Sequence, residues 1–145
     1  MDLPVGPALA SDLPAITALL QAARLPLAGI ESWTGSTMVA RQDSKIVGCA
    51  ALELYGDSAL LRSVAVDAAL RGQGLGQQLT AAALDLARAR GVRRVYLLTE
   101  TAGEFFPRFG FRRSTRAAVD AKVQASIEFT TACAASALVM ELTLA

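Results

Sequence analysis

Residues 59–76, ALLRSVAVDAALRGQGLG, decide the fold of this 145-residue chain. The first part, residues 59–66, is almost continuously apolar, which is typical of a central strand covered on both faces. The last part has glycines at positions 72, 74 and 76, directly before a stretch with helical periodicity. Glycine lets the backbone turn tightly and approach a ligand closely. A strand, a glycine-rich loop and a helix in this order predict an anion site at the start of the helix.

The segments around this unit predict an α/β (α+β) domain in which two long helices cover a mixed sheet. The helix after the loop stops at Gly91 and has one apolar stripe, made of Leu75, Leu79, Ala82, Ala83 and Leu86. Leu84 lies off this stripe, so a second, partly covered face is expected. An earlier helix has Ser11 as its N-cap and extends to Arg24. Strands are expected over residues 3–9, 36–41, 45–54, 59–66, 92–99, 111–114 and 137–144.

The C-terminal part of the chain carries weaker patterns. Residues 101–109 are expected to form a short helix that ends at Gly110. Residues 117–131 form a late insertion, either an amphipathic helix or an ordered loop, with Val119, Val123 and Ile127 on one side. Because no linker or repeat interrupts the sequence, residues 1–145 are expected to form a single domain.

Composition excludes several classes of function. The chain has no histidine, which removes Ser-His and Cys-His nucleophile pairs and histidine metal sites, so no metal is expected. Cys49 and Cys133 lie far apart and are expected to be free thiols, with Cys133 buried. A net charge of +1 gives no electrostatic argument for nucleic acid or an anionic membrane. We see no signal peptide or membrane span, so we expect a cytoplasmic location.

The glycine loop itself allows several interpretations. A Walker loop needs lysine and then serine or threonine after its last glycine, but Gln77 and Gln78 follow Gly76. A dinucleotide fingerprint needs a further glycine where Gln77 or Leu79 stands. A glycine-rich turn that binds nothing is a third interpretation.

Two segments resemble the GNAT superfamily of N-acetyltransferases. The pattern Arg-x-x-Gly-x-Gly, preceded by Val64-Ala65-Val66 and the acidic turn at Asp67, resembles its acetyl-CoA motif. Residues 106–111, FPRFGF, resemble its aromatic-x-x-x-Gly-Phe segment. The sequence is more similar still to a bacterial branch named arsenic-resistance N-acetyltransferase. The matching segments are LLRSVAV at 60–66, YLLT at 96–99, EF at 128–129 and CAASA at 133–137.

The resemblance implies transfer of an acetyl group from acetyl-CoA to a primary amine of a small molecule, such as an amino-acid-like metabolite or toxin. It implies a mixed sheet that splays between two strands, where the pantetheine arm pairs with the backbone and the amine attacks the thioester directly. The implied cofactor-binding residues are Val64, Val66, Arg71, Gly72, Gln73, Gly74, Leu75, Gly76, Gln77, Thr99, Phe106 and Arg108.

The chain departs from the family pattern at two catalytic positions. Many relatives have an acidic residue at the position of Leu60 and a tyrosine at the position of Phe106. Both absences favour a second hypothesis, a non-catalytic acyl-CoA-binding or regulatory module. A protein N-acetyltransferase is a third, although the near-neutral charge gives no steering toward basic tails. The late insertion and last strand are compatible with a homodimer.

Other residues are candidates for the missing chemistry. Glu53 is the first candidate for the general base, directly or through water, and Glu100 is the second. A solvated or salt-bridged surface carboxylate is the alternative for Glu53. Arg62 is a candidate ligand for a substrate carboxylate or phosphate, against a structural ion pair. Glu128, in the late insertion, is a candidate for acceptor binding and a third candidate base.

Overall fold

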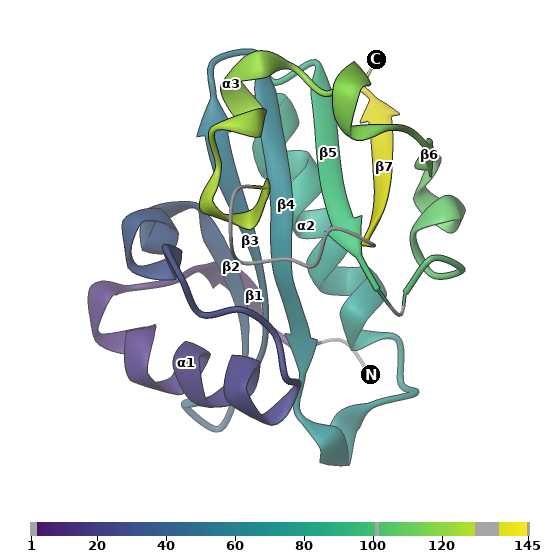
Figure 1. The fold of residues 1–145 in the computed structure, drawn as a ribbon. Helices are drawn as coiled ribbons and strands as arrows, with labels where there is room; N and C mark the ends of the chain where they lie inside the picture. Colours follow the sequence, from purple (N-terminus) through teal and green to yellow (C-terminus); the bar gives the residue numbers. More distant parts are fainter. Residues whose placement is uncertain (1–2, 101, 130–136, 145) are drawn as a thin grey trace.

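The chain folds into a seven-stranded sheet with helices on both faces, shown by the computed structural model in Figure 1. The structure describes residues 3–100, 102–129 and 137–144. The strands lie in the order β1-β2-β3-β4-β5-β7-β6, and of the pairs in this sheet only β4 and β5 run parallel. Their bounds are β1 Val5–Pro7, β2 Thr37–Gln42, β3 Lys45–Tyr55, β4 Ser58–Val66, β5 Arg94–Thr99, β6 Arg112–Arg113 and β7 Leu138–Thr143. The predicted mixed α/β fold is confirmed.

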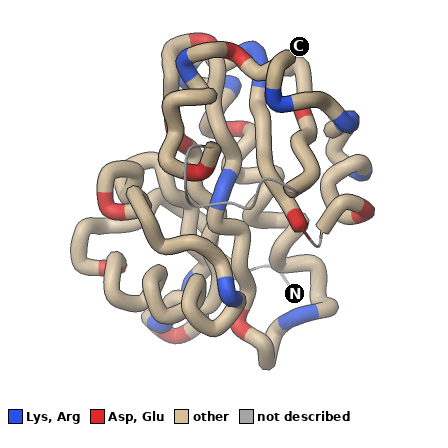
Figure 2. Tube along the Cα trace, in the orientation of Figure 1, with Lys and Arg blue, Asp and Glu red and all other residues tan. Residues whose placement is uncertain are grey.

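Two helices cover opposite faces of the sheet. Helix α1, Leu13–Ala22, lies in front of the sheet in Figure 1, and α2, Leu75–Ala89, lies behind it. The α2 face holds the larger apolar core, and α1 covers a second core that includes Ile16 and Leu20. In the described part of the chain no helix has both the length and the apolar character to cross a membrane. Figure 2 shows basic and acidic residues interspersed around the molecule, as the net charge of +1 implies.

Helix α2 begins and ends at glycines, as predicted. Gly74 is its N-cap with φ 83°, and Gly91 lies just beyond its end with φ 78°. Both conformations are left-handed and favour glycine. The buried stripe differs from the predicted one because Leu84 is buried while Ala82 and Leu86 are only partly covered. Its members are Leu75, Leu79, Thr80, Ala83, Leu84 and Ala87.

The late insertion is less regular than a single amphipathic helix. It contains a 3-10 turn, Arg116–Ala118, and the short helix α3, Ala121–Gln124. Val119 and Val123 are buried as predicted, but Ile127 is 37% exposed, so its place on the apolar side is wrong. In the preceding segment, Phe106–Phe109 forms only a 3-10 turn before Gly110. Cys133 and residues 130–131 lie outside the described residues.

The first helix is capped by Asp12 rather than by Ser11. Helix α1 begins at Leu13, after a 3-10 turn over Ala10–Asp12. The Asp12 carboxylate accepts a hydrogen bond from the Leu9 amide at 2.8 Å and pairs with both terminal nitrogens of Arg41 at 2.5 and 3.1 Å. The helix also ends earlier than predicted, at Ala22. One carboxylate therefore ties the entrance of α1 to strand β2.

Replacing Asp12 with asparagine is expected to lower the free energy of unfolding by about 1 kcal/mol at neutral pH, because the charge is lost but an oxygen remains for Leu9. The Arg41 guanidinium, and then the Leu9 amide, hold the pKa of Asp12 below its ordinary 3.8. A lowered pKa stabilises the fold above that value, and this contribution is lost as pH falls through the folded-state pKa. Urea unfolding should therefore show a difference between the two proteins that shrinks in acid. An unchanged difference would contradict this assignment.

Candidate functional site

The sheet opens where β4 and β5 stop pairing. Their parallel ladder contains only Ser58↔Arg94, Ala59↔Val95 and Leu60↔Tyr96. Beyond it β4 still pairs with β3 as far as Val66, and β5 still pairs with β7 as far as Thr99. Figure 1 shows the two strands diverging toward their carboxyl ends. The predicted splay between two strands is therefore confirmed.

A β-bulge accompanies the opening. The register between β3 and β4 shifts between Cys49 and Ala51, and Ser63 has φ 58°, a left-handed conformation that is uncommon for serine. The Cys49 thiol donates to the Ser63 carbonyl at 3.2 Å, and burial raises the pKa of Cys49 to about 12. Cys49 is therefore a packed thiol beneath the bulge and not a reactive group.

A cleft of about 340 Å³ occupies the opening between the strands. Its floor includes Leu61 and Val64 of β4 and Leu97 and Leu98 of β5. Such a cavity, mostly apolar with a few polar groups, is typical of small-molecule sites. The remaining lining residues are Ala23, Arg24, Leu25, Pro26, Ser63, Thr99, Glu100, Ala102, Phe106, Glu128 and Ala137.

A second pocket, of about 350 Å³, lies over the glycine loop. Gly72 and Gly74 both have φ 83°, and a Cβ built on either would meet no atom within 4 Å. The first amides of α2 have no acceptor within the helix and, with the helix dipole, favour an anion. Arg71 is exposed at the rim and donates from Nε to the Val66 carbonyl at 3.2 Å. The full lining is Val66, Leu70, Arg71, Gly72, Gly74, Leu75, Gly76, Gln77, Phe105 and Arg108.

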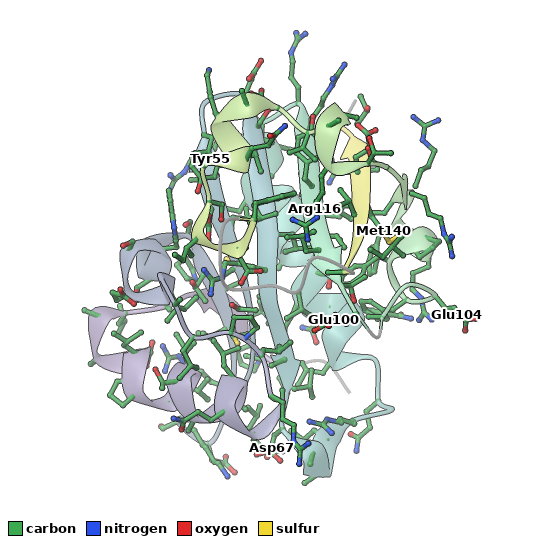
Figure 3. All side chains as sticks on the ribbon, viewed as in Figure 1. Tyr55, Asp67, Glu100, Glu104, Arg116 and Met140 are labelled. Carbon is green, nitrogen blue, oxygen red and sulfur yellow. The ribbon has the colours of Figure 1, made fainter. Side chains whose placement is uncertain are left out.

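A third hollow connects the loop pocket to the cleft. Phe105 and Arg108 belong both to it and to the loop pocket, while Thr99 and Glu100 belong both to it and to the cleft. The Arg108 guanidinium lies 4.8 Å from the centre of the Phe105 ring. Figure 3 shows Glu100 beyond the lower end of β5, on the side of the opening. The three hollows therefore adjoin one another, from the helix start to the gap between the strands.

A buried polar network lies behind the cleft, centred on Arg62. The Arg62 side chain is 0% exposed and forms ion pairs with Glu53 at 2.8 Å and Glu128 at 3.5 Å. It also donates to the carbonyls of Ala28 at 2.7 Å and Pro26 at 3.2 Å, and from Nε to the Ser63 hydroxyl at 3.1 Å. These contacts engage all three nitrogens of the guanidinium, through four hydrogen bonds and the ion pair to Glu128. Arg62 therefore holds together the α1–β2 connection, β3, β4 and the late insertion.

Tyr55 completes the network on its far side. Its hydroxyl donates to Glu53 Oε1 at 2.5 Å, while Glu53 Oε2 accepts from Arg62. Burial, followed by the hydrogen bond to Glu53, raises the pKa of Tyr55 to about 12. Tyr55 thus stays protonated and remains a donor at neutral pH. Figure 3 shows it at the upper end of β3, away from Glu100.

The structure separates the predicted catalytic and substrate-binding residues into two groups. Glu100 and Glu128 line the cleft. Glu53 does not; its carboxylate is 1% exposed and forms the salt bridge that the alternative expected, with Arg62, but in the interior rather than at the surface. Arg62 does not line the cleft, and its 0% exposed side chain is engaged by Glu53, Glu128 and backbone carbonyls, which favours the structural ion pair over a direct contact with substrate.

Most of the predicted cofactor residues line the connected pockets. The cleft includes Val64, Thr99 and Phe106, and the loop pocket includes Val66, Arg108 and every residue from Arg71 to Gln77 except Gln73. Sequence reasoning missed Phe105, which joins two of the pockets, and Arg24, which lies at the cleft beyond the end of α1. An arginine at the C-terminus of a helix is common, because it interacts favourably with the helix dipole, so Arg24 gives only a weak signal of a site. Nothing in the sequence indicates that it lies near strand β4, about forty positions later.

Residues 33–113, more than half of the chain, match the family described as Acetyltransferase (GNAT) domain. The chain belongs to the GNAT acetyltransferase family. Acetyl-CoA is the acyl donor of GNAT enzymes. The family match covers the splayed strands β4 and β5 and the glycine loop.

The relatives of this GNAT chain include amino-acid acetyltransferases. That of Mycobacterium tuberculosis is 43% identical over 81 residues, which cover 54% of this chain and 45% of the relative. That of Neisseria meningitidis is 29% identical over 88 residues, which cover 59% of this chain and 20% of the relative. The chain thus spans less than half the length of these curated relatives.

Solved structures match this GNAT chain over nearly its whole length. Rv2747 from Mycobacterium tuberculosis, in complex with CoA and NLQ, has a TM-score of 0.83 and 29% identity and covers 98% of this chain and 99% of its own. N-acetylglutamate synthase from Neisseria gonorrhoeae, complexed with coenzyme A and N-acetyl-glutamate, has a TM-score of 0.85 at 22% identity, covering 100% of this chain and 36% of its own. The second likeness shows the fold alone.

Proposed function

We propose that this GNAT chain transfers the acetyl group of acetyl-CoA to the primary amine of a small, amino-acid-like molecule by direct attack. The observation that carries the proposal is the connected path from the glycine-loop amides to a cleft between splayed strands that holds two carboxylates, Glu100 and Glu128. The amino-acid acetyltransferases among the relatives support the same acceptor class. Acetylation linked to arsenic resistance, implied by the similar bacterial branch, stays a prediction.

The donor is expected to lie along this path. The amides at the start of α2, together with Arg71 and Arg108, would hold the pyrophosphate, because helix starts and guanidinium groups favour phosphate. Phe105 and Ala102 lie along the way to the cleft. The thioester would then lie between Val64 and Leu97, where the strands no longer bond to each other.

Chemistry in the cleft requires a neutral amine. The amine nitrogen forms a bond to the thioester carbonyl carbon, the C–S bond breaks, and the amine loses one proton while the departing thiolate gains one. Glu100 is exposed at the mouth of the cleft and is assigned to accept the amine proton through water. Because Phe106 offers no phenol, water supplies the proton to the thiolate.

Leu60 explains why no carboxylate acts from the family's usual strand position. It is fully buried and packs with Tyr96, Val119, Val123 and Val139 beneath the late insertion. A charge there would lack water and a partner. Glu100 and Glu128, which line the cleft, are therefore the candidates for proton transfer in place of this position.

Thiol release from acetyl-CoA with a panel of primary amines tests the proposal. Glu100→Gln is expected to lower kcat by about 100-fold, the lower range for loss of a general base, while calorimetry shows unchanged coenzyme A affinity. Glu31→Gln, an exposed carboxylate outside the pockets, is the control and should behave as wild type. Coenzyme A binding without thiol release for any amine would contradict the proposal and favour a non-catalytic acyl-CoA-binding module.

A further inference from the structure

The cleft has charges of opposite sign on its walls. Arg24 follows helix α1, whereas Glu128 lies in the late insertion, and both line the same cavity of about 340 Å³. Among the described residues of the lining, Glu100 is the third charged one, and it also lines the hollow next to the donor pocket. A free α-amino acid carries an ammonium and a carboxylate close together, so this arrangement matches a zwitterion better than a simple amine.

Glu128 is held in place from behind. It is 5% exposed, and the buried Arg62 guanidinium lies 3.5 Å from its Oε2. Its backbone amide donates to the Ser126 hydroxyl at 3.1 Å. The same guanidinium is shared with Glu53 at 2.8 Å. Two buried carboxylates thus share Arg62, and Glu128 places one of them on the cleft wall, where it would attract an incoming ammonium.

Arg24 is exposed and has a conformation that costs energy. Its φ is 57°, in the left-handed region that is unfavourable for a residue with a Cβ. This is the helix-ending position where glycine is usual, with the Leu25 amide bonded to the Leu20 carbonyl at 2.9 Å. Among residues 3–100, 102–129 and 137–144, no hydrogen bond or ion pair engages the Arg24 guanidinium. The strained backbone thus keeps a planar, bidentate donor at the cleft.

We propose that Arg24 binds the carboxylate of a free α-amino acid acceptor while Glu128 binds its ammonium group, so that the amine meets the thioester between β4 and β5. This inference rests on the proposed function and names its substrate class. It assigns to Arg24 the task that sequence reasoning gave to Arg62. Arg62 instead is a positioning residue that keeps Glu128 at the cleft.

Paired acceptors test this assignment. Common L-amino acids without a second carboxylate are each compared with the amine that lacks the α-carboxylate, for example L-leucine with isopentylamine. For the best amino acid, the wild type should show a kcat/KM at least about 10-fold above that of its amine. Arg24→Ala should raise the KM of that amino acid by about 10- to 100-fold, leave its kcat within a few-fold, and leave the amine unchanged. Arg24→Lys should fall between the two because it keeps the charge and loses the bidentate fork.

The matched control is Arg90→Ala, since Arg90 is an exposed arginine at the end of the other long helix and lines neither the cleft nor the loop pocket. It should act as wild type on both acceptors. Glu128→Gln should weaken amino acid and amine alike, because both carry an ammonium. A wild type that prefers no amino acid over its amine would overturn the inference, as would equal losses on both acceptors in Arg24→Ala.

A binding measurement separates this inference from the proposed function. Calorimetry of the same L-amino acids with the coenzyme A-saturated protein should show affinity that falls about 10-fold or more in Arg24→Ala. Binding that depends on Arg24 without thiol release would refute the proposed function alone. Thiol release from simple amines, with no contribution from a carboxylate, would refute this inference alone.

Discussion

Replacing Gly74 with tryptophan is expected to weaken coenzyme A binding by at least about 100-fold, or about 2.7 kcal/mol. Gly74 has a left-handed φ of 83°, and open space lies over its missing Cβ. In the proposed complex the pyrophosphate fills that space, so an indole would occupy the volume beside the first amides of α2. Isothermal calorimetry with coenzyme A measures the change.

Gly91 provides a matched control at the other end of the same helix. It also has a left-handed φ, 78°, and no atom lies within 4 Å of a Cβ built on it. Gly91→Trp therefore introduces the same side chain and similar backbone strain far from the loop pocket. If both variants bind coenzyme A like the wild type, or if both lose it equally, the assignment of the pyrophosphate to the start of α2 is wrong.

Replacing Arg62 with methionine is expected to lower the free energy of unfolding by about 3–5 kcal/mol. The substitution leaves Glu53 and Glu128 buried without their shared cation and removes the donors to the carbonyls of Pro26 and Ala28. A domain of this size has a total stability of about 5–15 kcal/mol, so the variant should unfold at a much lower urea concentration.

A second substitution separates lost charge pairing from lost packing. Adding Glu53→Gln to Arg62→Met should recover part of the stability, because a neutral amide is less costly to bury than an unpaired carboxylate. Arg41→Met is the control, since Arg41 also pairs with a carboxylate but its side chain is 33% exposed. Its loss should lower the free energy of unfolding far less than the loss of Arg62. An Arg62→Met variant as stable as Arg41→Met would contradict the structural role of the network.

The elements near the glycine loop could be predicted because local patterns specify them. An apolar strand, a loop with three glycines and a striped helix each have their own sequence signal, and they occur in succession in residues 59–89. The splay was implied by family resemblance rather than by the residues themselves. Its local partner, the bulge at Ser63, has no signal in the sequence because serine rarely adopts a positive φ.

The polar residues of the site could not be placed from sequence because their neighbours come from distant segments. Glu53 looks like a surface carboxylate at the end of a strand, yet Arg62 and Tyr55 enclose it. Ile127 follows the helical spacing of Val119 and Val123, but the insertion breaks into short turns before reaching it. In both cases tertiary contacts, not local propensity, decide the outcome.

The buried contacts of Arg62 with several segments limit how such a domain can evolve toward new acceptors. A single substitution at Arg62, Glu53 or Ser63 leaves buried polar groups on several segments without a partner. We therefore expect few substitutions to be tolerated in this buried network. Arg24 at the rim of the cleft is under no such constraint, since its guanidinium bonds to no described residue. Selection for a new substrate should therefore change residues at the rim, such as Arg24, before it changes the buried residues around Arg62.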